Sequence, residues 1–416
     1  MRLRLTLLLT AFVFSRAIAQ DFWVQTNGPA GGAVTSLAID STGAVLAGTL
    51  SGGVFRSSDL GETWEQINNG LADTNVRTIA VSPGGSFFAG LDHSGVFRSS
   101  DSGQTWVPAG LTNKHVKSLV IDSNGYVFAV AFDSLRGIFR STDNGANWTQ
   151  VYDLYFFNMS FNDITISMNG YVWAVASRGD PGPCPCGRGV KLSTDNGNNW
   201  TDAGLSSELY SIAISQTGTI YAGSIARIFR STDDGNTWTL TDTLLGTYVK
   251  AISNNSDGQA FAAMYGGGVF WSTNSGDIWI ALNSGLTDSD VSALTVDPAG
   301  YIFVGTHSGG VFRSLQSTTG IKEPSHGIPS SFSLKQNYPN PFNPETRIRY
   351  ELPKEVKVLL KIYNILGQEV VTLVNDLQKA GGYEVELTGG KFATGVYFYR
   401  LQAGEFVETK KLVLVK

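Results

Sequence analysis

A seven-residue pattern, Ser/Thr-Asp-x-Gly-x-x-Trp, recurs along this chain and limits the folds open to it more than any other feature. Full copies begin at Ser58, Ser100, Thr142, Thr194 and Thr232, and a sixth, from Thr273, keeps the Gly and Trp but has lost the Asp. The Asp carboxylate can accept hydrogen bonds from backbone amides two residues on, and Gly supplies the positive φ of a tight turn. The Trp begins the returning strand and gives it a large apolar body to bury. Each copy therefore predicts a turn between two strands.

The spacing of the repeats predicts an all-β propeller. The apolar pair before each turn begins at Val54, Val96, Ile138, Val190, Ile228, Val269 and Val311, so successive repeats are 42, 42, 52, 38, 41 and 42 residues apart. In the first repeat, the apolar runs 34–39, 45–47 and 54–55 precede the Trp strand 64–67. Four strands in a unit of this length are typical of a propeller blade, whereas the repeats of a β-solenoid, the alternative, are usually shorter. We expect seven four-stranded blades, one with an insertion.

The two ends of the repeat array predict how the ring closes. The seventh repeat has apolar runs at 291–296, 301–304 and 311–313 but lacks the turn motif and the Trp strand. A matching strand, Trp23-Val24-Gln25-Thr26, lies before the first repeat. We expect this N-terminal strand to complete the last blade and to remove the open sheet edges.

Composition and the N-terminus predict an exported protein. The net charge is −5, charged residues are 16% of the 416, and no basic stripe is present, so nucleic acid is not an expected partner. Arg2 and Arg4 precede an apolar run and Ala17-Ile18-Ala19, which predicts a signal peptide over residues 1–19. That run is too short to span a bilayer, and no other segment is apolar enough. We expect a monomer without a transmembrane segment.

Composition changes after residue 314 and predicts a second domain. Residues 315–331 are rich in Ser, Thr, Gly and Pro and are predicted to form a linker. Alternating strands are expected at 346–352, 356–363, 369–374, 383–387, 396–401 and 406–415. They predict a small antiparallel, immunoglobulin-like sandwich over residues 332–416.

Two resemblances follow from these motifs. The repeated turn resembles the Asp box, or bacterial neuraminidase repeat, of sialidases, sortilin-type receptors, xyloglucan-cleaving endoglucanases and photosystem assembly factors, and it covers residues 20–314. Residues 332–416 resemble the C-terminal sorting domain (type A) of the type IX secretion system, through Asn337–Pro344, Ile362-Tyr363-Asn364, Gly395–Phe398 and Lys410–Leu414. The second resemblance implies passage through the periplasm and recognition by the secretion machinery. It also implies release from the cell or attachment to its surface.

Positions that recur between repeats are expected to serve the blade. The Arg of the apolar run recurs as Arg56, Arg98, Arg140, Arg230 and Arg313. The turn motif supplies Asp59, Trp64, Asp101, Trp106, Asp143, Trp148, Asp195, Trp200, Asp233 and Trp238. We interpret both sets as structural, and no metal site is predicted because each Asp box lacks the several oxygen ligands that calcium requires.

Positions that differ between repeats are candidates for function. They are expected on the face of the propeller opposite the one that carries the Asp-box turns. The residue that begins each inner strand is Ala33, Asn75, His115, Ser160, Glu208, Tyr248 or Asp290. The predicted ligand-binding set is His115, Tyr155, Asp180, Glu208, Tyr248, Asp290, Asp92, His93 and Asp133. The insertion at residues 177–189 is the predicted specificity loop, and Cys184 and Cys186 are interpreted as a local disulfide rather than a metal site.

Two functions remain open on this reading. The first is a non-catalytic secreted or cell-surface propeller that binds carbohydrate or protein. The second is a glycoside hydrolase, sialidase-like or endoglucanase-like, which needs a pair of carboxylates across a cleft. The sequence has neither the Arg-Ile-Pro motif nor the Tyr-Glu arrangement of a sialidase. We therefore expect binding rather than catalysis, no catalytic residues and no cofactor.

Overall fold

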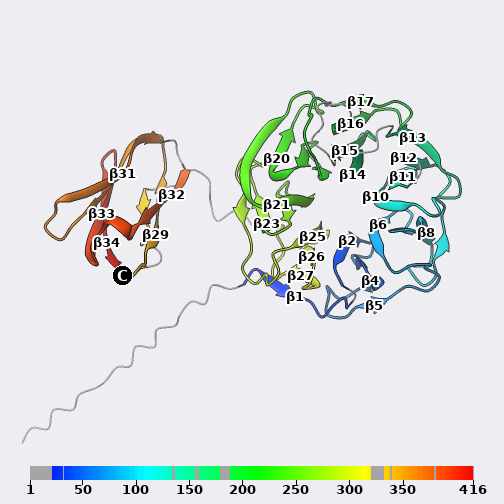
Figure 1. The fold of residues 1–416 in the computed structure, drawn as a ribbon, viewed down its shortest axis with the longest axis horizontal. Coiled ribbons are helices and arrows are strands. Elements are labelled where there is room, and N and C mark those ends of the chain that lie inside the picture. The colour runs from blue at the N-terminus through cyan, green and yellow to red at the C-terminus, as the bar shows by residue number, and fades with distance from the viewer. Residues whose placement is uncertain are drawn as a thin grey trace, which may run out of the picture. The chain divides into compact units, whose positions relative to one another are not determined.

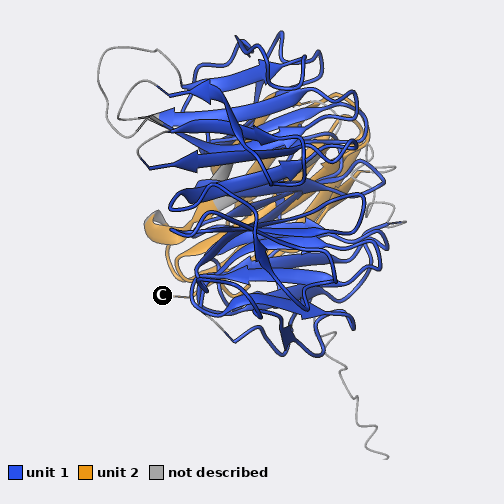
Figure 2. Cartoon of the chain, turned by 90° about the vertical axis from the view of Figure 1, so that its right-hand side faces the viewer, with its two compact units in different colours: residues 1–320 blue, residues 321–416 orange. Residues whose placement is uncertain are grey.

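The computed structural model divides into two compact units, residues 1–320 and 321–416 (Figures 1 and 2). It describes residues 21–30, 32–133, 136–154, 159–178, 188–319, 332–337, 340–378 and 381–415. The predicted signal peptide and most of the predicted linker lie outside these ranges. The two units are described separately below.

The first unit is a seven-bladed propeller, as predicted (Figure 1). Blade 1 is β2 (Val34–Ile39), β3 (Val45–Thr49), β4 (Gly53–Ser57) and β5 (Glu65–Gln66). Blade 2 is β6 (Val76–Val81), β7 (Phe87–Leu91), β8 (Val96–Ser99) and β9 (Val107–Pro108). Blade 3 is β10 (His115–Ile121), β11 (Val127–Phe132), β12 (Gly137–Ser141) and β13 (Thr149–Asp153). Blade 4 is β14 (Met159–Ile166), β15 (Val172–Arg178), β16 (Gly189–Ser193) and β17 (Thr201–Asp202). Blades 5 and 6 are β18 (Ser211–Ile214), β19 (Ile220–Gly223), β20 (Ile225–Ser231), β21 (Thr239–Asn254), β22 (Ala260–Met264), β23 (Gly268–Ser272) and β24 (Ile280–Ala281). They share β21, which is outermost in blade 5 and innermost in blade 6.

Blade 7 closes the ring with the N-terminal strand, as the sequence predicts. It contains β25 (Val291–Val296), β26 (Ile302–Thr306), β27 (Val311–Ser314) and β1 (Trp23–Gln25). β1 pairs antiparallel with β27, with Trp23 opposite Ser314. The Trp23 side chain is 2% exposed and its indole Nε1 donates to the Leu282 carbonyl oxygen over 2.5 Å. The first and last strands of the propeller are thus held in one sheet.

The repeated turn has the expected partners with one difference in spacing. Asp59 accepts from the amide of Thr63, four residues on rather than two, at 2.9 Å, and from the Thr63 hydroxyl at 2.6 Å. The Ser57 hydroxyl donates to Asp59 and accepts from the amide of Gly61. Both Leu60 and Gly61 have positive φ, 59° and 92°, so the turn uses two left-handed residues in succession. The hydrogen bonds to Thr63 and Ser57 hold the pKa of Asp59 at about 2.

Most Trp residues of the repeat and some of its Arg residues connect neighbouring blades, which the sequence alone did not reveal. The Trp106 indole in blade 2 donates to the Ile67 carbonyl of blade 1 over 2.6 Å. Arg230 in blade 5 donates to the Ser275 carbonyl in the turn of blade 6 over 2.7 Å. Arg140 and Arg313 likewise donate to carbonyls in the turn of the next blade, whereas Arg56 and Arg98 bond within their own blades. Several blade boundaries are therefore fixed by an indole, a guanidinium or both.

The second unit is a two-layer sandwich, as predicted. One sheet contains β28 (Ser333–Leu334), β29 (Glu345–Leu352) and β32 (Gly381–Thr388). The other has the order β31 (Glu369–Gln378), β30 (Val356–Tyr363), β33 (Gly395–Ala403) and β34 (Phe406–Leu414), and a short 3-10 helix, η1, spans Gly389–Lys391. Buried side chains of both sheets, including Ile348, Leu360 and Tyr399, form its core. Within the described parts of the chain, no helix has the length and apolarity needed to cross a membrane.

Candidate functional site

The innermost strands of the seven blades surround the propeller axis (Figure 1). The residues that the sequence analysis placed at the start of these strands lie beside the loops that follow the second strand of each blade. The amides of Asp92, Tyr265 and His307 donate to the carbonyls of Asn75, Tyr248 and Asp290, respectively. The residues that differ most between repeats are therefore gathered on one face, around the axis.

A β-bulge lies at the same place in six innermost strands. The pairing register with the second strand shifts around Thr35, Arg77, Lys117, Asn162, Lys250 and Ser292. Each of these residues is two positions beyond the residue that the sequence analysis placed at the start of the inner strand, and Tyr210 is the equivalent in blade 5. Bulges redirect a side chain, and these six positions, together with Tyr210, form a ring of seven near the axis.

Three members of this ring are cations. In blades 1 and 7 the position holds a hydroxyl that ties adjacent blades: Thr35 donates to the Val76 carbonyl over 2.6 Å, and Ser292 donates to the Val34 carbonyl. In blades 2, 3 and 6 it holds Arg77, Lys117 and Lys250. At these three positions a cation stands where the repeats of blades 1 and 7 have a hydroxyl.

The two lysines occupy the bulge position of the innermost strands of blades 3 and 6. Burial and the nearby charges of Lys250 and Arg77 lower the pKa of Lys117 to about 8. Burial also lowers the pKa of Lys250. Blades 3 and 6 are not neighbours in the ring, so the effect of one charge on the other indicates that both lie near the axis. Both residues nevertheless remain exposed to solvent. The ammonium groups are thus surrounded by protein and open to a small solute.

Asp163 lies next to this group and ties three blades together. Its carboxylate accepts from the Ser118 hydroxyl of blade 3 at 2.8 Å, from its neighbour Ile164 at 2.9 Å and from the Ile212 amide of blade 5 at 3.0 Å. Enclosure by protein raises its pKa to about 6, although these hydrogen bonds and Lys117 oppose the rise. The neighbouring Asn162 accepts from the Lys117 ammonium over 2.5 Å.

Three of the predicted site residues meet at the boundary of blades 2 and 3. Asp92 Oδ1 lies 2.9 Å from His115 Nδ1, and the His93 and His115 rings are 3.9 Å apart between centroids. Arg77 Nη2 donates to Asp92 Oδ2 over 2.8 Å and, with His115, holds the pKa of Asp92 at about 2. The His115 ring stacks on Phe132 with a centroid separation of 4.9 Å.

A second group of predicted residues lies at the boundary of blades 5 and 6. The Tyr210 and Tyr248 rings meet edge to face at 4.8 Å, and the Lys250 ammonium lies 5.3 Å from the centre of the Tyr248 ring. Burial and the neighbouring Glu208, which hydrogen-bonds to the phenol, raise the pKa of Tyr210. Tyr248 is 36% exposed, so this ring is available to a ligand on the axial face.

The remaining predicted residues are more dispersed. Asp133 is exposed at the end of the second strand of blade 3, and Asp290 is half-buried in blade 7. Tyr155, Asp180 and the cysteines 184 and 186 lie outside the described residues, as does most of the predicted specificity loop at 177–189.

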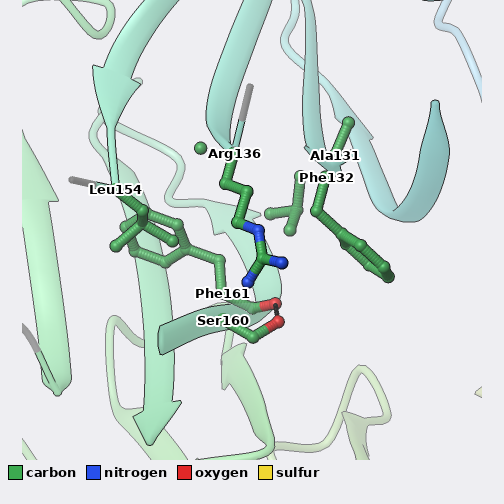
Figure 3. Close-up of a pocket in the computed structure, with 8 residues that line it drawn as sticks. Ala131, Phe132, Arg136, Leu154, Ser160 and Phe161 are labelled. Atoms are coloured by element: carbon green, nitrogen blue, oxygen red, sulfur yellow. Dashed lines mark hydrogen bonds between the residues drawn. The ribbon is translucent and has the colours of Figure 1, made fainter. Parts of the chain in front are cut away.

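The cavity between blades 3 and 4 is too small to be a ligand site. Arg136, Phe132, Leu154, Ser160 and Phe161 are among the residues that line it (Figure 3). Its volume of about 10 Å³ admits at most one water molecule. The Arg136 guanidinium points into it (Figure 3). The axial face is therefore the better candidate for binding a solute.

The predicted site residues surround this candidate site but do not include the cations at its centre. The prediction took the residue expected to begin each inner strand, whereas Arg77, Lys117 and Lys250 lie two residues further on. The unequal residue types at 35, 77, 117, 162, 210, 250 and 292 were the signal that could have identified the ring.

Comparison with known proteins identifies the second unit. Residues 336–416 match the family described as the secretion system C-terminal sorting domain. A C-terminal sorting domain is present. It indicates export by the type IX secretion system to the cell surface or the extracellular space, and it implies an interaction with that machinery. Residues 23–156 match the DUF6242 beta propeller domain. No curated protein matches the chain.

Solved structures share the fold at low identity. The extracellular domain of the hybrid two component system BT3049 from B. thetaiotaomicron is 13% identical, with a TM-score of 0.64, over 95% of this chain and 58% of that one. PorZ, a surface component of the type IX secretion system of Porphyromonas gingivalis, is 16% identical, with a TM-score of 0.54, over 96% and 61%. YCF48 bound to D1 peptide is 16% identical, with a TM-score of 0.52, over 72% and 99%. This chain therefore spans about three fifths of the first two structures, and the likeness concerns the fold alone.

Proposed function

We propose that this protein is a non-catalytic propeller, secreted or held at the cell surface, that binds an acidic extracellular carbohydrate on its axial face. The observation that carries the proposal is the bulge position that Lys117, Lys250 and Arg77 share on the innermost strands around the axis, where their like charges also lower the pKa of Lys117. Like charges enclosed in protein are unfavourable to each other, and a bound carboxylate would relieve this repulsion. A uronic-acid residue supplies such a carboxylate.

The aromatic residues around the cations favour a sugar over a simple anion. The exposed face of Tyr248 lies beside Lys250, and Tyr210 packs against its edge. Tyrosine offers an apolar ring together with a polar hydroxyl, which suits a sugar ring that carries hydroxyl groups. A uronate bound here would place its carboxylate on the ammonium groups and its ring on the aromatic side chains.

The carboxylates of this face support binding rather than hydrolysis. A glycosidase needs one carboxyl group that gives up a proton to the leaving oxygen and a second that attacks or activates water. Asp163 has the raised pKa of an acid, but both its oxygens already accept protein hydrogen bonds. Asp92 is held ionised by Arg77. Neither is arranged as a free proton donor opposite a second free carboxylate.

Titration calorimetry with decamers of galacturonic acid, and with their methyl-esterified counterparts, tests the proposal. We expect the acid form to bind and the neutral ester to bind poorly. Lys117→Met and Lys250→Gln should each weaken binding by roughly ten- to hundredfold, the value of a charge-assisted hydrogen bond.

Lys114→Gln is the matched control, because Lys114 carries the same charge but packs its ammonium over Phe139, 5.3 Å from the ring centre. It should leave the affinity unchanged. Equal binding of the ester, or an equal loss in the Lys114 variant, would refute the axial site. Release of reducing ends that Asp92→Asn abolishes would instead favour the glycoside hydrolase.

The affinity for the galacturonate decamer should fall as the pH rises from 7 to 9.5. Lys117 has a pKa of about 8 and loses its charge over this range, burial lowers the pKa of Lys250 in the same direction, and Arg77 stays charged. Asp163 and Asp92, with pKa values of about 6 and 2, are already ionised at pH 7. Below pH 6, protonation of Asp163 removes a negative charge beside Lys117, and binding should tighten. If the affinity did not change between pH 5 and pH 9.5 at fixed ionic strength, the prediction would be contradicted.

A further inference from the structure

We propose that Asp92, His93 and His115 form a binding site for a divalent transition-metal ion at the boundary of blades 2 and 3. One possible ligand atom from each of the three residues lies within 4.8 Å of the others. Asp92 and His93 follow β7, and His115 is the first residue of β10, so two neighbouring blades build the site. No metal site was predicted by the sequence analysis, which did not bring together His93 and His115, 22 positions apart in the chain.

The separations suit a metal ion after a small movement of one side chain. Bonds of about 2.1 Å from an ion to nitrogen or oxygen place neighbouring ligand atoms about 3.0–3.4 Å apart. Asp92 Oδ1 and His115 Nδ1 are already 2.9 Å apart. His93 Nε2 lies 4.0 Å from Asp92 Oδ2, and its side chain is 67% exposed, so it has room to turn towards the other two.

The surrounding contacts hold two of the three ligands in place. Arg77 engages Oδ2 of Asp92 and leaves Oδ1 to face His115. Phe132 stacks on the His115 ring with an interplanar angle of 1° and limits its rotation. Outer contacts of this kind orient metal ligands and sustain affinity. The Arg77 charge opposes a second cation, so we expect binding weaker than at a site without it.

The donor set indicates the class of ion. Two imidazoles and one carboxylate suit zinc, cobalt, nickel or copper, whereas calcium and magnesium prefer a shell of oxygen atoms. Three protein ligands leave a coordination position open to water or to a ligand on the axial face. The inference of a metal site does not rest on the proposed binding of carbohydrate.

Tag-free full chain, treated with a chelator and then titrated with Co²⁺ and Zn²⁺, tests this inference. We expect one ion per chain, a visible Co²⁺ absorption spectrum that Zn²⁺ displaces, and a higher thermal midpoint with Zn²⁺. His93→Ala and His115→Ala should each lower the metal affinity at least about tenfold, because losing even a residue that only orients a metal ligand costs that much.

His307→Ala is the control, because His307 lies on the same face near Tyr265 and outside the cluster. A variant with Cys184→Ser and Cys186→Ser separates thiolate binding from binding at the proposed site. The inference is overturned if no ion binds with one-to-one stoichiometry. It is also overturned if binding disappears with the cysteines, or if His307→Ala costs as much as His115→Ala.

Discussion

Replacing Trp23 with alanine is expected to lower the free energy of unfolding of the propeller by about 3–5 kcal/mol, the usual cost of removing a buried tryptophan side chain. The indole is 2% exposed, packs with Phe312 and Val304 in the core of blade 7, and donates a hydrogen bond to Leu282 of blade 6. Its loss removes apolar contact and weakens the seam that joins the two ends of the ring. The seam is formed by only three strand residues, so few other contacts can compensate.

Urea unfolding followed by tryptophan fluorescence measures this effect in the full chain. All nine tryptophans lie before residue 280, so the signal reports the propeller and not the sorting domain. Val24→Ala is the matched control, because Val24 is the next residue of the same strand and is 36% exposed. That change should cost about 0.5 kcal/mol or less. Equal midpoints for the two variants would mean that the N-terminal strand does not hold the ring closed.

The blade count and the closure were predictable because each follows from counting. A repeat that lacks one strand, and a lone strand that resembles the missing one, leave little freedom in how the ring ends. The bounds of two inner strands were equally well specified: the sequence predicts 34–39 and 291–296, and the structure has β2 and β25 over those residues. Each is a short run rich in apolar and β-branched residues, the composition that favours a strand.

The parts that were not predicted depend on contacts between repeats. Trp106 was expected to bury its ring, but the sequence did not show that its indole reaches the Ile67 carbonyl of the blade before it. The strand β21 runs through what the repeat pattern divides into two strands, because residues 239–254 contain no proline and many β-branched residues that keep the chain extended. No single repeat contains the information that sets such contacts.

The axial cations show the same limit at the candidate site. The residues at the start of each inner strand were identified as variable, and the structure gathers Asp92, His93 and His115 and also Glu208 and Tyr248 into two groups. The position of the bulge, however, depends on pairing with the second strand. Sequence alone did not show that Lys117 and Lys250, 133 residues apart, interact across the axis.

Asp163→Ala is expected to destabilise the propeller by about 3 kcal/mol at pH 4 and by much less at pH 7.5. The change leaves the buried Ile212 amide and Ser118 hydroxyl without their acceptor, at a cost of about 1–3 kcal/mol for each group. The pKa of Asp163 rises from its usual value of 3.8 to about 6 in the folded chain because the carboxylate is enclosed. The folded state therefore binds this proton more tightly than the unfolded state does. The stability it contributes is complete below pH 3.8 and is lost as the pH rises through 6, by up to roughly 3 kcal/mol.

The pH dependence separates this charge effect from simple loss of hydrogen bonds. Urea midpoints of wild type and Asp163→Ala, followed by tryptophan fluorescence, should converge between pH 4 and pH 7.5, because only the wild type titrates at this position. Asp163→Asn keeps an oxygen for Ser118 and Ile164 but turns an amide donor towards the Ile212 N–H, so it should also be destabilised at pH 4. Neither variant titrates at this position, and the difference between them should stay constant with pH. A wild-type-to-alanine gap that is equally wide at pH 4 and pH 7.5 would show that Asp163 is not an enclosed carboxylate, and that the three blades it joins are held together by other contacts.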